Sequence, residues 1–432
     1  MASPKGNLSN RGEKFASPTS KMPMQDVVND LWHPEKNPGG YICLGSADNF
    51  CVESHFLATG DGFAGSHRLR ETLSRFVNRH FKPHEQITKD QVIVTSGTGQ
   101  ATELSGFALC DRGDGVLLAR PHYGNYPMDL GHRVEAKIVG VSLGDIDPFS
   151  VETVAAYEKA LEEAQKQGIR VRVLMLCNPH NPLGRCYTPE VLKAYMKFCQ
   201  KHNLHLISDE VYALTVWKNP YAPDAPGFTS VLSINPDGLI DRNLTHVLWG
   251  MGKDFGACGL RIGCLISQNQ DYLRACEANS YFSCPSTLAD LATERILSDD
   301  VFVDNYIKEN RLRLAENYVL TTKFLESHGI PYNKGTNSGL YVWADLFQPI
   351  RTQINARQEK TGDSENTLKA IEAKLQETLL KHKIFVASGA DFGSDVPGWF
   401  RVVFALDKTY LQLGLERMVG AVDAYRRDLE ED

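Results

Sequence analysis

Short, nearly continuous apolar runs recur along the middle of this chain, and helical patterns separate them. Val171–Cys177 is such a run, interrupted by one charged residue, Arg172. A strand that is apolar at successive positions is typical of a sheet covered on both faces. Strand-like and helical segments alternate from residue 91 to residue 267. We therefore expect an α/β fold, with a mostly parallel sheet and helices on both faces.

The C-terminal part has a different pattern. Residues 287–328 are strongly helical, and the strand-like runs Gly339–Ala344 and Phe400–Ala405 follow, with helical patterns at 364–382 and 407–426. Few strands among several helices predict a smaller α+β domain.

These patterns divide the chain into four expected segments. Residues 1–22 are rich in Ser, Lys, Asn and Pro and are expected to be a disordered leader. Residues 23–50 are expected to be an N-terminal segment of the small domain. The large domain should span 51–304 and the small C-terminal domain 305–432.

Composition excludes several classes of function. The chain has 432 residues and a net charge of -7, and its 46 Lys and Arg residues are scattered, so we expect no nucleic-acid or anionic-membrane partner. No apolar run is long enough to span a bilayer, and no signal-peptide core begins the chain. The ten cysteines include no CxxC pair, which favours a reducing compartment without disulfides or zinc. A cytoplasmic protein that binds no metal is expected.

A small-residue turn follows the predicted strand Gln91–Thr95. It contains Thr98, Gly99 and Gln100 and leads into a helical pattern that ends at Leu109. The first N–H groups of a helix have no partner within the helix, so a strand, a turn and a helix start together can bind an anion. A plain tight turn is the alternative, but this context favours a phosphate site.

Three other predicted strands end in side chains that could face a ligand. Tyr123 follows one strand, in the region where ligands of open α/β sheets bind, although ring packing is the alternative. The Asn-Pro steps around Asn181 impose a rigid turn that leaves amide groups free. Asp209, followed by Tyr212, ends an apolar strand and requires a cation, because a lone buried carboxylate costs much free energy. A protonated pyridine ring or a nearby arginine would serve.

Lys253 follows an apolar strand directly, with Gly250 and Gly252 before it. Burial favours a neutral lysine amine, which is the form that makes a Schiff base with an aldehyde cofactor. Arg261 follows on a glycine-bearing loop and could hold a phosphate. A solvated lysine in a turn is the structural alternative. Further on, Arg401 interrupts an apolar strand, so it needs either a substrate carboxylate or an internal acid.

Taken in order, these parts resemble the fold-type-I pyridoxal-phosphate enzymes of the class I aminotransferase superfamily. Within it, the chain is most similar to 1-aminocyclopropane-1-carboxylate synthase and its relatives. The resemblance extends from about Gly40 to about Met418. It rests on four motifs: Asn178-Pro179-x-Asn181-Pro182-Leu183-Gly184, Ile207-Ser208-Asp209-Glu210-x-Tyr212, Lys253-Asp254-x-Gly256-x-x-Gly259-x-Arg261-x-Gly263 and Pro397-Gly398-Trp399-Phe400-Arg401.

The resemblance implies pyridoxal 5'-phosphate as cofactor and a role for each matched residue. Lys253 would form the Schiff base (aldimine) and then act as base at the substrate Cα, with Asp209 and Tyr212 as further catalytic residues. Asp209 would pair with the ring nitrogen. The other cofactor contacts would come from Thr98, Gly99, Gln100 and Arg261 at the phosphate, Tyr123 on the ring face, and Asn181 and Tyr212 at the ring hydroxyl. Substrate would contact Arg401, Asn181, Ala47 and Phe63.

The chain departs from the family at several of these positions. Phe63-Ala64-Gly65 stands where the family has Tyr-x-Gly, and Gly250-Met251-Gly252-Lys253 stands where it has Ser-x-Ser-Lys. Ala47-Asp48-Asn49 replaces the usual Ala-Glu-Asn, and His180 stands where a serine is common. These changes disfavour cyclopropane synthesis without affecting proton removal at Cα.

We therefore expect an enzyme that acts on an L-α-amino acid or its conjugate through an external aldimine and a Cα carbanion. The altered pocket resembles relatives in fungal secondary metabolism, which favours a lyase that acts by β/γ-elimination or substitution, of carbon–sulfur type. Aminotransferase, 1-aminocyclopropane-1-carboxylate synthase and a non-catalytic cofactor-binding descendant are the alternatives. A nucleotide-binding dehydrogenase is excluded because no G-x-G-x-x-G follows the first strand. The resemblance also implies a homodimer.

Overall fold

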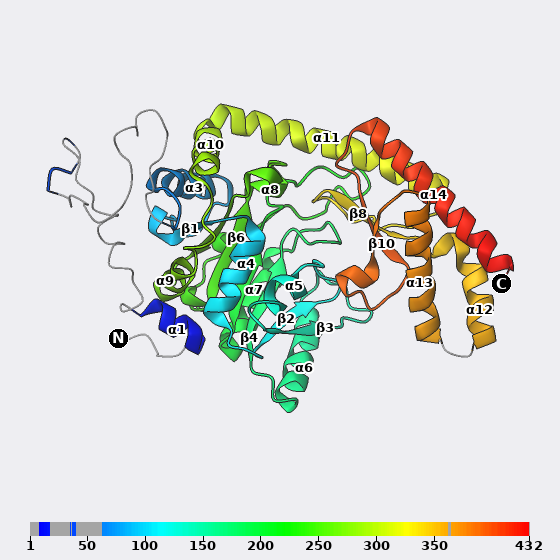
Figure 1. The fold of residues 1–432 in the computed structure, drawn as a ribbon, viewed down its shortest axis with the longest axis horizontal. Coiled ribbons are helices and arrows are strands. Elements are labelled where there is room, and N and C mark those ends of the chain that lie inside the picture. Colours follow the sequence, from blue (N-terminus) through cyan, green and yellow to red (C-terminus); the bar gives the residue numbers. More distant parts are fainter. Residues whose placement is uncertain (1–7, 18–34, 36, 40–62, 362–363, 432) are drawn as a thin grey trace.

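The computed structural model describes residues 8–17, 35, 37–39, 63–361 and 364–431. Within these residues, a large domain is built on a seven-stranded sheet and a small domain on a three-stranded sheet (Figure 1). No described helix combines the length and the apolar character needed to cross a membrane.

The large sheet has the strand order β1-β7-β6-β5-β4-β2-β3. Six strands run in one direction, and β7 is antiparallel to both of its neighbours, β1 and β6. The mostly parallel sheet is therefore confirmed. In this order the strands are Val92–Thr95, Gly263–Ser267, Thr245–Gly250, His205–Asp209, Val171–Cys177, Gly115–Ala119 and Lys137–Val141.

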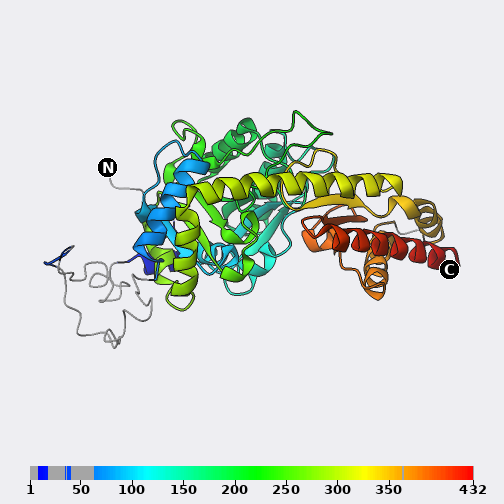
Figure 2. The same cartoon turned by 90° about the horizontal axis from the view of Figure 1, so that it is seen from above.

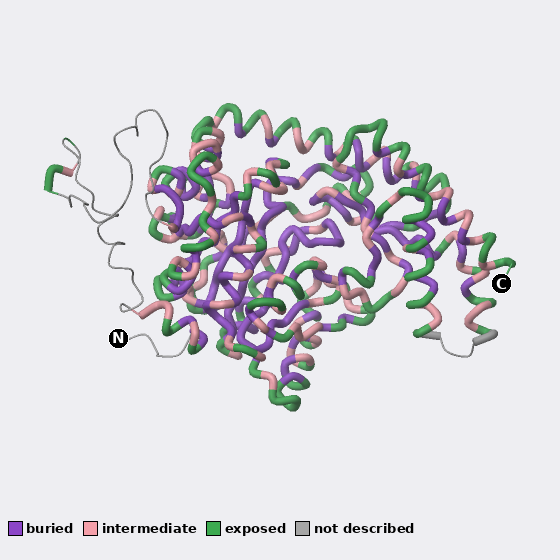
Figure 3. Tube along the Cα trace, in the orientation of Figure 1, coloured by how far each residue is buried: buried purple, intermediate pink, exposed green. Residues whose placement is uncertain are grey.

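Helices cover both faces of this sheet, as expected, and alternate residues of each strand pack against them. In β4, Leu174 and Leu176 join one apolar cluster, and Val173 and Met175 join the other. Buried residues therefore run through the middle of the domain (Figure 3). The first face is covered by α3 (His67–His80), α6 (Thr153–Lys166) and α7 (Pro189–His202), and the second by α4 (Thr98–Leu109), α5 (Tyr126–Gly131) and α9 (Gln270–Ala278).

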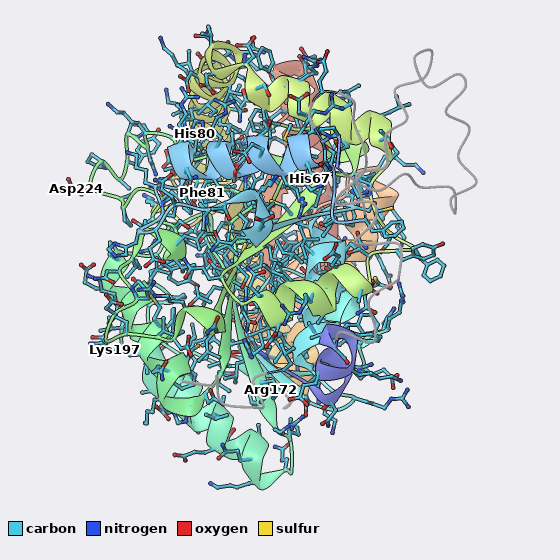
Figure 4. All side chains as sticks on the ribbon, turned by 90° about the vertical axis from the view of Figure 1, so that its left-hand side faces the viewer. His67, His80, Phe81, Arg172, Lys197 and Asp224 are labelled. Carbon is cyan, nitrogen blue, oxygen red and sulfur yellow. The ribbon has the colours of Figure 1, made fainter. Side chains whose placement is uncertain are left out.

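Helix α3 shows how local sequence sets an element. Ser66 caps its first turn by accepting a hydrogen bond from Leu69 N at 3.0 Å. Leu69, Leu73 and Phe76 recur at helical spacing and are buried. The helix lies across the surface between His67 and His80 (Figure 4).

The expectation of a disordered leader is wrong for residues 8–17. Helix α1 (Asn10–Ala16) packs against α4 and α9. Ser9 caps the helix and its N–H donates to Ala108 O at 3.1 Å, while Gly12 lies so close that a Cβ there would overlap with Ala108 O. The rest of the predicted leader, like most of 23–50, lies outside the described residues.

One long helix connects the domains. The helical pattern at 287–328 divides into α10 (Thr287–Ser298) and α11 (Asp300–Ser327), because Asp299 caps α11 by accepting from Phe302 N. Helix α11 runs from the large domain to the small one (Figure 2). Val303 packs in the large core and Leu314 in the small one. We therefore propose that the domain boundary lies within α11.

The small domain confirms the α+β expectation. Its antiparallel sheet has the order β8 (Tyr341–Asp345), β10 (Trp399–Val403), β9 (Ala387–Ser388). Helices α12 (Arg351–Thr361), α13 (Ser364–Lys381) and α14 (Lys408–Glu431) accompany it, and α12 is an element that the sequence pattern missed. The remaining short elements are α8 (Met251–Asp254) and the 3-10 turns η3 (Lys89–Gln91), η4 (Val231–Ser233), η5 (Arg242–Leu244), η6 (Cys258–Leu260), η7 (Gln348–Ile350) and η8 (Gly389–Phe392).

Candidate active site

A cavity of about 290 Å³ lies where the carboxyl ends of β4, β5 and β6 meet the start of α4. Eight of the predicted cofactor residues line it: Thr98, Gly99, Tyr123, Asn181, Asp209, Tyr212, Lys253 and Arg261. Parallel strands place their carboxyl ends at one edge of the sheet, so residues far apart in sequence converge there.

One end of the cavity has the form of an anion site. The first turn of α4 has no side-chain cap, and its N-cap residue, Gly97, has a φ of 84°. Arg261 reaches this turn and donates to Ser96 O at 3.1 Å. A Cβ at residue 97 would lie 2.6 Å from the Arg261 Nη2 atom, so a side chain there would displace the guanidinium from its present position. Uncapped N–H groups beside an arginine fit a phosphate.

The glycine that replaces a serine before Lys253 has a structural reason. A Cβ at Gly250 would lie 2.8 Å from Ile262 O, and a Cβ at Gly263 would lie 2.5 Å from Gly97 C. The ends of β6, β7 and β1 therefore meet through close backbone packing. In this arrangement a serine hydroxyl at position 250 has no space.

Asp209 gives the cavity lining a carboxylate, in contrast to the anion site at the start of α4. Tyr126 Oη donates to its Oδ2 at 2.7 Å, and burial raises the pKa of Asp209 to about 6, while the bonds from Tyr126 and Val211 N and the charge of Lys253 oppose that rise. Among the described residues, no arginine pairs with this carboxylate. The sequence left a choice between an arginine and a cationic ring, and the geometry fits the ring.

Lys253 lies in the single turn of α8, and its neighbour Asp254 anchors that turn. The buried Asp254 accepts hydrogen bonds from Trp249 Nε1 at 2.8 Å and from Leu214 N at 3.1 Å. Burial raises the pKa of Asp254 to about 8. Because these partners fix the turn, Lys253 is presented to the same cavity as Asp209.

Aromatic rings and an amide occupy the sides of the cavity. Tyr123 meets Tyr126 edge to face, with ring centroids 5.1 Å apart. Tyr212 is buried, and burial raises its pKa well above the usual range. Asn181 Oδ1 accepts from Arg401 Nη1 at 3.0 Å, which connects the small domain to the cavity.

Arg401 has unused hydrogen-bonding capacity. Its guanidinium carbon lies 4.7 Å from the ring centroid of Phe392 and 5.1 Å from that of Tyr341. Its buried Nε has no hydrogen-bond partner within the described part of the chain. No ion pair with an internal acid is found there either, so the arrangement suits an external carboxylate.

Two predicted residues that the structure describes, Gln100 and Phe63, do not line the cavity, and Arg401 reaches it through Asn181. The Gln100 side chain bonds with Ser96 N and Ser283 Oγ and does not line the cavity, and its contact with the cofactor stays a prediction. Phe63 packs edge to face against Tyr281, with centroids 4.7 Å apart, and does not line the cavity of its own chain. Ala47 lies outside the described residues.

The sequence reasoning missed lining residues that stand close to the predicted ones. Tyr126 and Asp129 both lie in α5, shortly after Tyr123, and Cys258 follows Lys253. Their local sequence carries no signal of a role. They could have been found only from their position, shortly after the strand ends that carry Tyr123 and Lys253.

This set of groups defines a class of protein: an enzyme that binds a phosphorylated pyridine aldehyde as its cofactor. The residues fit that group, since the uncapped α4 turn and Arg261 match the phosphate, Asp209 matches the ring nitrogen, and Lys253 matches the aldehyde.

Comparison with known proteins gives the family. A family model of class I and II aminotransferases matches residues 55–418. The "Probable aminotransferase tcpI" of Claviceps purpurea (strain 20.1) is 33% identical over 415 residues, which cover 95% of this chain and 91% of that protein. The 1-aminocyclopropane-1-carboxylate synthase 2 of Solanum lycopersicum is 30% identical over 416 residues, with 90% and 81% covered.

A solved structure supports the same fold. Aspartate aminotransferase from Thermus thermophilus with maleate has a TM-score of 0.68 at 22% identity and covers 86% of each chain. The chain belongs to the class I and II aminotransferase family. It is an enzyme that depends on pyridoxal 5'-phosphate, as the resemblance implied.

Proposed function

We propose that this enzyme acts on an L-α-amino acid, or on a conjugate of one, as a carbon–sulfur lyase that eliminates a leaving group from the side chain. The main observation in support is that Lys253 and Asp209 line one cavity, while Arg401 contacts that cavity through Asn181. The first two groups serve proton removal at Cα, and the third serves recognition of the α-carboxylate.

When bound, pyridoxal phosphate supplies an electron sink for the electrons of the substrate Cα–H bond. Lys253 is proposed to take the proton from Cα and to return a proton to the departing group or to the product. Asp209 would hold the ring nitrogen of the cofactor by its negative charge. Arg401 binds the α-carboxylate with two parallel N–H groups, which fixes the direction of the Cα–H bond.

The charges around the cavity support a substrate whose side chain is not acidic. Among the described lining residues, the cations are Lys253 and Arg261, and both have proposed partners on the cofactor. A dicarboxylate would need another cation, so the lining that the structure describes offers little to the acidic 2-oxo acids that serve many aminotransferases.

The deciding experiment mixes the holoenzyme with cysteine S-conjugates and with simple amino acids. A lyase releases thiol, ammonia and a 2-oxo acid in equal amounts and leaves the cofactor unchanged. An aminotransferase converts the cofactor to pyridoxamine phosphate without loss of the leaving group. Accumulation of pyridoxamine phosphate without thiol would overturn the lyase proposal.

Aminotransferase is the second candidate function, because the similar Claviceps purpurea protein carries that name. A 1-aminocyclopropane-1-carboxylate synthase is disfavoured by Phe63, where the family has a tyrosine. A non-catalytic descendant is disfavoured by the joint presence of Lys253 and Asp209 in the cavity. A holoprotein whose visible spectrum responds to no amino acid would favour that last alternative.

We also propose a homodimer in a reducing, cytoplasmic setting. Phe282 is 94% exposed beside Tyr281, which packs on Phe63, and such exposed rings are typical of a protein contact. The eight described cysteines are free. Light scattering should give the mass of two chains, and a monomer that turns over substrate would contradict the dimer.

A further inference from the structure

Asp129 places a carboxylate beside the first turn of α4. It belongs to α5, lines the cavity, and faces Gly99: a Cβ on Gly99 would lie 3.7 Å from Asp129 Oδ1 and 3.8 Å from Oδ2. Within the described residues this carboxylate has no hydrogen-bond partner. The group is therefore free to bond to whatever occupies the first turn of α4.

That position creates a conflict of charge. The first turn of α4 is the proposed site of the cofactor phosphate, so two anions would lie side by side in a partly enclosed cavity. The charges of Asp209 on β5 and Glu103 on α4 also repel an ionised Asp129. Glu103 is partly neutralised by Arg133, at 3.2 Å.

The cations of the cavity do not resolve this conflict. Lys253, on α8, is assigned to the aldehyde, and Arg261 is directed to the α4 turn, where it bonds to Ser96 O. Neither forms an ion pair with Asp129 in the described part of the chain. The remaining way to remove the repulsion is to bind a proton.

We propose that Asp129 is protonated whenever the cofactor phosphate is bound and that its O–H group donates a hydrogen bond to a phosphate oxygen. The acid thereby supplies the hydroxyl donor that a serine at position 250 cannot supply, because Gly250 has no space for a side chain. This inference rests on the proposed placement of the phosphate at α4.

The electrostatics of the cavity agree with this role. Burial, followed by the charges of Asp209 and Glu103, raises the pKa of Asp129 to about 6. A bound phosphate adds a further anion and raises the pKa again. The sign follows: binding is accompanied by proton uptake above about pH 6, so affinity for the cofactor should fall as the pH rises through this range.

The test measures the dissociation constant of pyridoxal phosphate from the apoprotein between about pH 5.5 and about pH 8.5, by absorbance. The variants are Asp129→Asn, which keeps a donor and has no charge, and Asp129→Ala, which has neither. We expect the wild type and Asp129→Asn to bind alike at low pH. At about pH 8 the asparagine variant should bind roughly tenfold to a hundredfold more tightly, since each pH unit above the pKa costs about tenfold.

Comparison of the two proteins cancels the titration of the phosphate itself. Asp129→Ala should bind more weakly than Asp129→Asn at every pH, because the donor is lost. A ratio of the two constants, wild type to Asp129→Asn, that stays the same across the range would overturn the proposal. So would a wild type that gains affinity over Asp129→Asn as the pH rises.

A separate pair of measurements tests the placement of the phosphate. Pyridoxal, which lacks the phosphate, should bind the wild type and Asp129→Asn with the same pH dependence. Arg261→Gln should weaken the binding of pyridoxal phosphate and leave that of pyridoxal unchanged. If Arg261→Gln affects both ligands equally, the placement is wrong, whatever Asp129 does.

Discussion

Asp209 and Arg401 carry opposite charges, yet both are held among apolar groups with incomplete pairing. Tyr126 is the one side chain found to hydrogen-bond to Asp209 within the described residues, and Arg401 keeps an unpartnered Nε. Buried charges without partners lower stability, so their presence is typical of sites that complete themselves with a ligand. At this scale the chemistry depends on a few hydrogen bonds that can be removed singly.

Tyr126→Phe should shift the acid limit of activity to higher pH. Asp209 must be ionised to hold the ring proton, and burial raises its pKa to about 6, while the Tyr126 bond opposes that rise. Loss of one bond to a charged group corresponds to about one pH unit. The measurement is the pH profile of kcat together with that of the cofactor spectrum. Tyr195→Phe removes a buried tyrosine hydroxyl elsewhere, and a similar shift in that variant would contradict the assignment.

Arg401→Lys should raise KM for the amino acid by about tenfold to a hundredfold. Lysine retains the charge but cannot offer two parallel N–H groups to a carboxylate. Steady-state kinetics with a fixed amino acid measures this change. Cofactor affinity serves as the internal control and should stay the same; an unchanged KM would remove Arg401 from the substrate site.

At the scale of elements, helices can be predicted from local sequence wherever the apolar periodicity and the capping residues indicate the same bounds. Helix α7 (Pro189–His202) has buried apolar residues at helical spacing, Thr188 caps its start, and Asn203 ends it in the left-handed region. Helix α12 has almost no apolar face, and among its described side chains Ile354 is the one large apolar residue that is buried, so periodicity could not predict it. The antiparallel direction of β7 could not be predicted either, because no periodic pattern in the sequence encodes the direction of a strand.

The site residues also divide into those that local sequence predicts and those that it does not. Lys253 and Asp209 could be predicted because each follows or ends an apolar strand, where a charged side chain is costly unless a ligand or an opposite charge accompanies it. Tyr126 and Asp129 could not, since their roles depend on how α5 lies against β5 and α4. The side-chain bonds of Gln100 with Ser96 N and Ser283 Oγ could not be predicted either, because sequence shows where a residue falls in a helix but not which neighbours its side chain meets.

Gly12→Ala should detach α1 from the large domain. A methyl group at this position overlaps with Ala108 O, which neither backbone can relieve while the helix stays docked. Limited trypsin digestion should then cut after Arg11 or Lys14. Gly420→Ala is the matched control, because a Cβ there meets nothing within 4 Å. That variant should gain about 0.5–1 kcal/mol in the free energy of unfolding and resist cleavage as the wild type does.

At the scale of the whole molecule, the two domains meet where the cofactor and substrate residues lie. His122 N donates to Phe392 O at 2.9 Å, and Gly124 lies directly against Asp391 O. Phe392 in turn lies under Arg401. The loop that carries Tyr123 is therefore held by backbone contact against η8, and the Arg401 guanidinium lies over the ring of Phe392 in that turn.

Gly124→Ala should push these loops apart and raise KM for the amino acid, while cofactor affinity changes less. Asp395→Asn is the comparison, because it weakens the exposed Arg120–Asp395 pair, which is worth at most about 1 kcal/mol. Both variants are measured by steady-state kinetics and by chemical unfolding. An equal effect of the two would show that the close backbone approach has no special role.

The strand β7, inserted between β1 and β6, also determines when the site can exist during synthesis. Residues 97–99 leave the ribosome early, but they face Arg261 and the chain around Gly250 only after β7 has been made and inserted between the two older strands. A nascent chain that stops before residue 267 therefore contains the first turn of α4 but lacks the inserted strand that brings Arg261 and Gly250 against it. Retention on a phosphate-bearing resin would mark the moment at which the growing polypeptide completes this domain.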